Sequence, residues 1–332
     1  MGIDRSRTEV SRLELANLPT RIEKLKSQPW GSRVELYIKR DDQTGVELSG
    51  NKVRKLEYAM AEAMDQGCDT IITAGAVQSN HCRATAAACV RLGLDCVLIL
   101  SSDEKQALDG NYLLDELLGA TIIFVPTETF ATQLPEVMTD VKEELEAEFR
   151  KPYLIPVGAS NGIGTFGYFH AFDEILEQEK ELGVSFDTIV SAVGSGGTYA
   201  GLALANQVRN AGKKVIGINI AASREHFEQR ILGISRQFME YYGDFPFSLE
   251  DIYILEGYVG RGYALSSQSE LEFIRSFART EGIVLDPVYT GKAMGGLFQE
   301  LKEKSLFFEQ SRKILFIHTG GIFGLFPKRH QF

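Results

Sequence analysis

One lysine stands where a nucleophilic amine would be well placed. The residues Ser49-Gly50-Asn51 are typical of a turn, and the apolar residues that follow Lys52 recur at helical spacing, so Lys52 is expected where a loop becomes a helix. An amine becomes a nucleophile only when its ammonium form is destabilised, and a second cation, Arg54 or Lys55, would help to remove the proton. The alternative is a basic first helical turn whose three cations are solvated.

A glycine-rich turn is the second candidate. It follows the expected strand Thr188–Val193 and leads directly into a helix-like segment. Glycines let a backbone approach an anion closely, and the amides at a helix start favour negative charge. The turn differs from a Walker A loop and from a dinucleotide loop, and a tight turn without a ligand is the alternative. The phosphate site predicted from this pattern consists of Gly194, Ser195, Gly196, Gly197 and Thr198.

Polar side chains follow other expected strands. Ser79, Asn80 and His81 come after small residues at a helix start, which suits the binding of a carboxylate but also suits an ordinary helix cap. Tyr289 is a candidate acid or base, although a half-buried packing role is the alternative, and Thr319 is suited to hydrogen-bond a neutral ring nitrogen. A phosphate site, a reactive lysine, a carboxylate site and this hydroxyl together indicate the cofactor pyridoxal 5′-phosphate.

These residues need a scaffold that gathers the ends of several strands. Strand-like and helix-like segments alternate along the chain, which indicates βαβ units and a largely parallel sheet covered on both faces. Such sheets bind ligands at the carboxyl ends of their strands. The expected strands are Val34–Ile38, Thr70–Ala74, Cys96–Leu100, Thr121–Val125, Tyr153–Pro156, Thr188–Val193, Val215–Ile220, Ile283–Leu285 and Ile314–His318. The expected helices include Ala84–Leu92, Leu134–Phe149, Thr165–Gln178, Thr198–Asn210, Glu270–Glu281 and Lys292–Lys304.

Composition excludes several classes of function. A chain of 332 residues predicts two domains, or one large domain with a subdomain. The net charge of -10 argues against nucleic acid and anionic membranes as partners and leaves small molecules. The N-terminal segment has no apolar core and no long uncharged apolar run occurs, so a cytoplasmic location is expected. The four cysteines form no CxxC pair and the histidines are scattered, so we expect reduced cysteines and no metal site.

The sequence also resembles a known family over nearly its whole length. Leu18-Pro19-Thr20-Arg21, Ser49-Gly50-Asn51-Lys52 and His318-Thr319-Gly320-Gly321 resemble motifs of the pyridoxal-phosphate enzymes with the tryptophan-synthase β-like fold. Within that family, the chain is similar to the group that holds D-cysteine desulfhydrase and 1-aminocyclopropane-1-carboxylate (ACC) deaminase. The resemblance implies a two-domain α/β fold with parallel sheets. The large cofactor-binding domain would comprise residues 1–52 and 166–332, and the small domain residues 53–165.

Residue roles follow from this resemblance. It implies that Lys52 is the Schiff-base lysine, which also takes the Cα proton of the substrate. Asn80 would hydrogen-bond the ring hydroxyl of the cofactor. Ser79 would hold the substrate carboxylate or assist proton transfer, and His81 would line the same pocket.

The remaining roles concern the phosphate group, the two active-site tyrosines and the ring nitrogen of the cofactor. The loop of residues 194–198 would bind the phosphate together with Lys55. Tyr263 and Tyr289 resemble the pair of active-site tyrosines, and Thr319 resembles the partner of the ring nitrogen. A neutral threonine at that position is expected to favour elimination over transamination.

The substrate is inferred from two differences within the group. ACC deaminases carry a glutamate and a leucine where this chain has Thr290 and Thr319, a pattern similar to that of D-cysteine desulfhydrase. We therefore expect β-elimination of D-cysteine to pyruvate, sulfide and ammonia. The alternatives are an L-cysteate sulfo-lyase that uses Arg261, an ACC deaminase, or a non-catalytic carrier of the cofactor. The resemblance further suggests a homodimer. Ser49, where many members have glycine, is a difference from the group.

Overall fold

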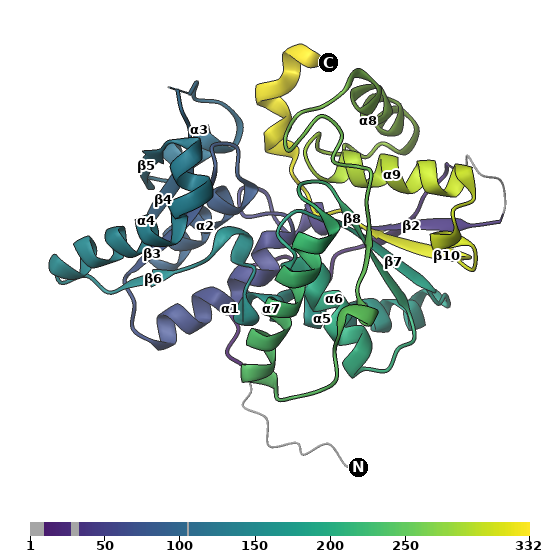
Figure 1. Ribbon diagram of the computed structural model, residues 1–332, viewed down its shortest axis with the longest axis horizontal. Coiled ribbons are helices and arrows are strands. Elements are labelled where there is room, and N and C mark those ends of the chain that lie inside the picture. The colour runs from purple at the N-terminus through teal and green to yellow at the C-terminus, as the bar shows by residue number, and fades with distance from the viewer. Residues whose placement is uncertain (1–9, 28–32, 105) are drawn as a thin grey trace.

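The structure is a computed structural model that describes residues 10–27, 33–104 and 106–332 (Figure 1). Its larger sheet has six strands in the order β1-β2-β10-β7-β8-β9, and every pairing is parallel except that of β1 with β2. These strands are β1 (Ile22–Lys24), β2 (Glu35–Lys39), β7 (Thr188–Val193), β8 (Lys214–Asn219), β9 (Tyr253–Leu255) and β10 (Lys313–Ile317).

The smaller sheet has four parallel strands in the order β5-β4-β3-β6. They are β3 (Thr70–Ala76), β4 (Asp95–Ser101), β5 (Thr121–Val125) and β6 (Pro152–Leu154). All four lie within one continuous part of the chain, whereas the larger sheet takes strands from both sides of it. The predicted α/β fold with parallel sheets is confirmed. The domain boundaries after residues 52 and 165 stay a prediction, because strand pairing alone does not define a boundary.

Helices connect the strands as βαβ units require. The helices are α1 (Asn51–Asp65), α2 (Asn80–Leu92), α3 (Gly110–Leu117), α4 (Thr127–Ala147), α5 (Gly162–Leu182), α6 (Gly197–Val208), α7 (Arg224–Tyr242), α8 (Gln268–Glu281) and α9 (Thr290–Glu303). Short 3-10 segments occur at Asp41–Gln43, Val157–Ala159, Leu249–Asp251, Leu306–Phe308 and Ile322–Gln331. Among the described residues, none of these helices is both long and apolar enough to cross a membrane.

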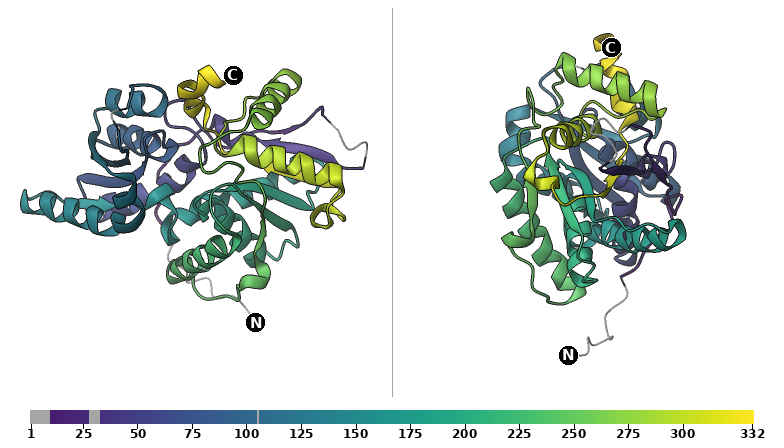
Figure 2. Two further views of the ribbon diagram at one scale, coloured as in Figure 1. Left: turned by 45° about the horizontal axis from the view of Figure 1, so that its top comes forward. Right: turned by 90° about the vertical axis from the view of Figure 1, so that its right-hand side faces the viewer.

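Alternating side chains of the larger sheet enter two different cores. Ile189 and Leu315 belong to the core that contains α1, α5 and α6, whereas Val190 and Phe316 belong to the core under α8 and α9. Figures 1 and 2 show these helices on opposite faces of the sheet. The first core also includes Leu98 of the smaller sheet, so one apolar core joins the two sheets. Burial on both faces explains why these strands are nearly continuous apolar runs.

The predicted elements differ from the structure in a few places. Residues 283–285 do not form the predicted strand, because the segment has no neighbouring strand and leads instead into the turn at Asp286. The short edge strands β1 and β9 were not predicted, nor were α3 and α7. A signal for α7 was present, since Phe227, Ile231, Ile234 and Phe238 recur at helical spacing and are buried.

Candidate active site

A cavity of about 320 Å³ contains most of the residues singled out by the sequence. The βα turns after β3 and β7 and the turn after β10 open into it, as does the start of α1. This volume is that of a small-molecule site. The predicted residues that line the cavity are Lys52, Ser79, Asn80, His81, Gly194, Ser195, Gly196, Thr198, Tyr263, Tyr289 and Thr319. Lys55 and Gly197 are not among its lining residues.

Close contact between two turns positions Lys52. Gly50 has φ +87°, and a Cβ there would lie 2.8 Å from the carbonyl oxygen of Thr319, so only glycine fits without strain. The same carbonyl accepts a hydrogen bond from the backbone N–H of Asn51 at 3.1 Å. The start of α1 and the turn after β10 therefore hold each other, and Lys52 faces the same cavity as Thr319.

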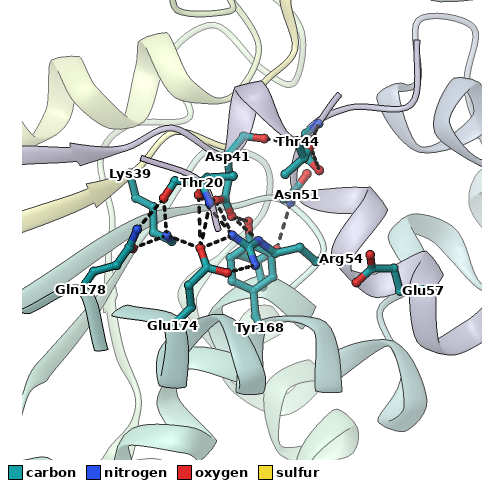
Figure 3. Close-up of polar contacts among 12 residues, drawn as sticks. Thr20, Lys39, Asp41, Thr44, Asn51, Arg54, Glu57, Tyr168, Glu174 and Gln178 are labelled. Atoms are coloured by element: carbon teal, nitrogen blue, oxygen red, sulfur yellow. Dashed lines mark hydrogen bonds and ion pairs between the residues drawn. The ribbon is translucent and has the colours of Figure 1, made fainter. Parts of the chain in front are cut away.

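A buried ion network fixes the first turn of α1 to α5 (Figure 3). Arg54 Nε donates to Asp41 Oδ2 and Arg54 Nη1 to Glu174 Oε2, both at 2.9 Å. Lys39 Nζ donates to Glu174 Oε1 at 2.6 Å, and Tyr168 OH donates to Asp41 Oδ2 at 2.5 Å. Buried charges are tolerated only when they are paired in this way. Arg54 thus anchors α1 and has its charge compensated away from the cavity.

Burial lowers the pKa of the Lys52 amine to about 8. The sequence suggested that a neighbouring cation would do this, and that explanation is wrong. Arg54 is paired with two carboxylates. Burial is also the chief cause that lowers the pKa of Lys55 well below its usual value. Desolvation alone makes Lys52 a usable nucleophile near neutral pH.

The glycine-rich turn joins β7 to α6 as predicted. Gly196 has φ +87°, and a Cβ on Gly197 would lie only 2.7 Å from Lys55 Nζ. Lys55 donates to the carbonyl oxygen of Gly158 at 2.8 Å and to Ser160 Oγ at 3.0 Å. Lys55 therefore packs against the glycine turn and links it to residues 158–160, without lining the cavity.

Side chains around this turn are also held in place. Ser195 Oγ and Ser160 Oγ lie 2.8 Å apart, and Thr198 Oγ1 accepts a hydrogen bond from Asn51 Nδ2 at 2.9 Å. Arg230 Nε donates to the carbonyl oxygen of Ser195 at 2.9 Å. A supported glycine turn at the start of a twelve-residue helix suits a phosphate group, because the backbone amides and the dipole at a helix N-terminus favour an anion.

The helix-cap role considered for the turn after β3 is confirmed at Ser79, whereas the binding of a carboxylate there stays a prediction. Ser79 caps α2, since its hydroxyl accepts from the backbone N–H of Cys82 at 3.2 Å, and it also lines the cavity. The imidazole of His81 is buried against β3, where Nε2 lies 2.9 Å from Thr73 Oγ1. Burial and the nearby charge of Lys52 keep the pKa of His81 well below its usual value, so its ring is neutral.

Two tyrosines form a pair at the edge of the cavity. Their hydroxyl groups share a short hydrogen bond, and the ring centroids of Tyr263 and Tyr289 lie 5.9 Å apart. The carboxylate of Asp286 accepts from the backbone N–H of Tyr289 at 2.9 Å, which fixes the turn before α9. The ring of Tyr289 lies over Gly194, where a Cβ would be 2.9 Å from Cε1. Burial raises the pKa of Tyr289, so its hydroxyl keeps its proton.

The residues used to predict the substrate lie in different environments. Thr319 lines the cavity, whereas Thr290 is buried and donates to Asp286 Oδ1 at 2.7 Å. Thr290 therefore stabilises the turn that begins at Asp286 and carries Tyr289. Arg261 is exposed and does not line the cavity. Lys52 is the only lysine, arginine, aspartate or glutamate among the described lining residues.

Sequence reasoning missed the residues that support the cavity from α2 and α3. Arg83 and Asn111 are both buried, and Arg83 Nε donates to Asn111 Oδ1 at 3.1 Å. Arg83 Nη1 also donates to Ser49 Oγ at 3.2 Å, so the serine that distinguishes this chain adds an acceptor in the loop before Lys52. Arg83 follows Ser79, Asn80 and His81 closely in the chain, but no local signal links it to Asn111, which is on a helix that was not predicted.

Comparison with known proteins agrees with this geometry. Residues 13–320 match the protein family described as "Pyridoxal-phosphate dependent enzyme". The chain is 44% identical to a bifunctional D-cysteine desulfhydrase/1-aminocyclopropane-1-carboxylate deaminase of Arabidopsis thaliana, over 96% of this chain and 80% of that protein. It is 38% identical to a D-cysteine desulfhydrase of Yersinia enterocolitica, over 100% of both chains.

A solved structure described as an ACC deaminase homologue is also similar. It superposes with a TM-score of 0.87 at 39% sequence identity and covers 97% of this chain and 95% of its own. The similarity thus extends over nearly the whole of both chains.

Proposed function

The chain belongs to the family of pyridoxal-phosphate dependent enzymes, and from this premise we propose that it is a lyase that converts D-cysteine and water into pyruvate, sulfide and ammonia. The observation that carries the choice of substrate is the charge of the cavity. Its described lining contains one ionisable cation, Lys52, and no carboxylate. A substrate whose leaving group is a thiol fits this lining, because the leaving sulfur needs no fixed counter-charge.

The residues of the cavity fit the cofactor. The turn of residues 194–198 offers backbone amides and hydroxyl groups to the phosphate, and Lys52 offers a desolvated amine to the aldehyde. Asn80 and Thr319 offer polar groups for the ring hydroxyl and the ring nitrogen. When bound, pyridoxal phosphate supplies a conjugated ring that accepts the electrons left when the Cα proton of an amino acid is removed.

The chain's own groups would bind the substrate and move its protons. Ser79 and the start of α2 would hold the substrate carboxylate by neutral donors, with Asn80 and His81 completing the same side of the pocket. Lys52, once its amine is free, would take the Cα proton. Tyr289 keeps its proton because burial raises its pKa, and it would donate to the leaving sulfur with Tyr263 as its hydrogen-bond partner.

ACC ring opening is the second candidate. It is supported by the names of similar proteins, one of them described as a bifunctional desulfhydrase and deaminase. The threonine at position 319 weighs against it, because the deaminase pattern has leucine there. Cysteate desulfonation has less support, since a sulfonate calls for a cation and Arg261 is exposed outside the cavity.

Product release from four substrates tests the proposal. Purified, cofactor-loaded protein would be given D-cysteine, L-cysteine, L-cysteate and ACC in parallel, and pyruvate, 2-oxobutyrate and sulfide would be measured. We expect sulfide and pyruvate from D-cysteine and none from the Lys52→Ala variant. Turnover of ACC alone would replace the desulfhydrase proposal by the deaminase. No turnover of any substrate by a protein that binds the cofactor would favour the carrier.

Two broader expectations belong with this proposal. We infer a homodimer from the resemblance to the family, and sedimentation of the cofactor-loaded protein measures its mass directly. We also infer a cytoplasmic location, which fractionation of the source cells would test.

A further inference from the structure

The amide of Asn80 has two ends of opposite chemistry, and only one of them can face the cavity. Its oxygen accepts hydrogen bonds and its nitrogen donates them. Which end faces the cofactor decides whether the ring hydroxyl meets a donor or an acceptor. The orientation of Asn80 is therefore a functional property, and the residues that impose it matter as much as Asn80 itself.

A chain of buried hydrogen bonds imposes this orientation. It begins at Arg83, whose guanidinium can only donate, so the atom of Asn111 that faces Arg83 Nε at 3.1 Å must be the oxygen. The amide nitrogen of Asn111 consequently points the other way. It donates to the backbone carbonyl of Gln78 at 3.0 Å, and a carbonyl can only accept, so the assignment is consistent at both ends.

The same nitrogen of Asn111 also donates to Asn80 Oδ1 at 3.0 Å. With its oxygen engaged there, Asn80 turns its own amide nitrogen away from α3. Asn80 lines the cavity and makes no other side-chain hydrogen bond among the described residues. The donor end of Asn80 is thus the end left for a ligand.

Burial and a second anchor make this arrangement rigid. Arg83 and Asn111 are 1% and 0% exposed, so water cannot substitute for either hydrogen bond. The guanidinium is held on its far side by the carbonyl oxygen of Glu47 and by Ser49, and the ring of Phe323 lies 5.0 Å from it. The backbone N–H of Asn111 donates to Gln78 Oε1 at 2.9 Å, which ties α3 to the turn that carries Asn80.

We propose that Asn111 is a positioning residue that fixes the amide of Asn80 with its N–H donors toward the ring hydroxyl of pyridoxal phosphate, and that Arg83 sets the polarity of this hydrogen-bond chain. The inference rests on the proposed role of Asn80 at the cofactor, but not on which amino acid is the substrate. It predicts that reversing the polarity at position 111 harms the cofactor site more than removing the side chain.

The Asn111→Asp variant reverses the polarity without changing the shape. A carboxylate still accepts from Arg83, but it presents an acceptor to Asn80, which must then rotate and turn its oxygen toward the cavity. Asn111→Ala frees Asn80 and removes one acceptor from Arg83, but it puts no acceptor opposite the oxygen of Asn80. We expect the dissociation constant for pyridoxal phosphate to rise roughly 10- to 100-fold in Asn111→Asp and less in Asn111→Ala, because a buried acceptor then faces the ring hydroxyl instead of a donor.

The absorption spectrum of the bound cofactor provides the second measurement. It reports whether the ring hydroxyl is ionised, and N–H donors stabilise the ionised form. We expect the pH at which this hydroxyl ionises to rise in Asn111→Asp and Asn80→Ala, more than in Asn111→Ala. Asn206→Asp is the matched control, since Asn206 makes two hydrogen bonds to the backbone of Lys213, and it should leave spectrum and affinity unchanged.

The outcomes separate the inference from its premise. An Asn80→Ala variant with an unchanged spectrum and affinity would overturn the role of Asn80 in the proposed function. A changed Asn80→Ala variant together with an unchanged Asn111→Asp variant would overturn only the positioning role of Asn111. A purely structural role predicts that Asn111→Ala has the larger effect. If Asn111→Asp does not fold, an Asn111→Ala variant with an unaltered ionisation of the ring hydroxyl would overturn the proposal.

Discussion

Replacing Asp115 by asparagine should stabilise the protein at neutral pH. Asp115 lies on α3 with its side chain fully buried, and neither carboxylate oxygen has a hydrogen-bond partner among the described residues. Burial raises the pKa of this carboxyl to about 8, and the nearby charge of Arg83 only partly opposes the shift. The folded protein therefore holds Asp115 in its neutral form, whereas the unfolded chain ionises it near its ordinary pKa of 3.8.

The size and sign of the effect follow from this difference. The folded state retains one proton that the unfolded state loses, so Asp115 makes the free energy of unfolding fall by about 1.4 kcal/mol for each pH unit between about 4 and 8. The stabilisation that the Asp115 proton gives the folded state is fully present below pH 3.8, the pKa of Asp115 in the unfolded chain. It is lost as the pH rises through about 8, the pKa in the folded protein. Asparagine does not ionise, so the variant lacks this pH dependence of the unfolding free energy. The stability advantage of Asp115→Asn should grow by about 2–3 kcal/mol between about pH 5 and pH 7.

Urea unfolding of both proteins at several pH values measures this difference. All other ionisable groups are common to the two proteins and cancel, so the difference between the curves reports Asp115. An Asp140→Asn variant on the exposed side of α4 controls for the change in net charge. If the two stability curves stay parallel from about pH 5 to pH 7, Asp115 is ionised in the folded protein and paired with Arg83, and the reasoning is refuted.

Three further predictions concern the cofactor site and its support. Gly197→Ala should weaken cofactor binding about tenfold or more, because its Cβ would lie 2.7 Å from Lys55 Nζ; wild-type affinity in a fluorescence titration would contradict this. Glu174→Gln should cost about 2–4 kcal/mol of unfolding free energy by removing one carboxylate from buried Arg54, and a loss below about 1 kcal/mol in urea unfolding would count against that pairing. The rate at which cofactor-free protein captures pyridoxal phosphate should rise with pH and level off above about 8, because only the neutral Lys52 amine reacts. A capture rate that does not change as the pH rises to about 8 would show that the Lys52 amine is already neutral at the lower pH.

Local patterns were sufficient for much of the fold and the cavity. Continuous apolar runs predicted the buried parallel strands, because such strands have both faces covered. Glycine turns that follow strands predicted where a phosphate would bind, since the carboxyl ends of parallel strands meet at one edge. The predicted strand at residues 283–285 is wrong, because an apolar run forms a strand only when a partner strand lies beside it.

Contacts between distant parts of the chain were beyond sequence patterns. Tyr263 and Tyr289 were named from a resemblance, but their shared hydrogen bond depends on how two turns pack. Neither the pairing of Arg54 with Glu174 nor that of Arg83 with Asn111 leaves a local signal, since the partners are 120 and 28 residues apart.

The sequence by itself determined the class of the protein: a parallel α/β chain of the pyridoxal-phosphate dependent family, with one lysine and one glycine turn predicted to bind the cofactor. These features are encoded in residues that are neighbours along the chain, so periodicity and turn chemistry reveal them. Only the tertiary structure decided that burial lowers the pKa of Lys52, that Lys55 donates to the carbonyl oxygen of Gly158, and that the amide oxygen of Asn80 accepts from Asn111. Desolvation and hydrogen-bond direction depend on what packs around a side chain, and packing is determined by the whole fold.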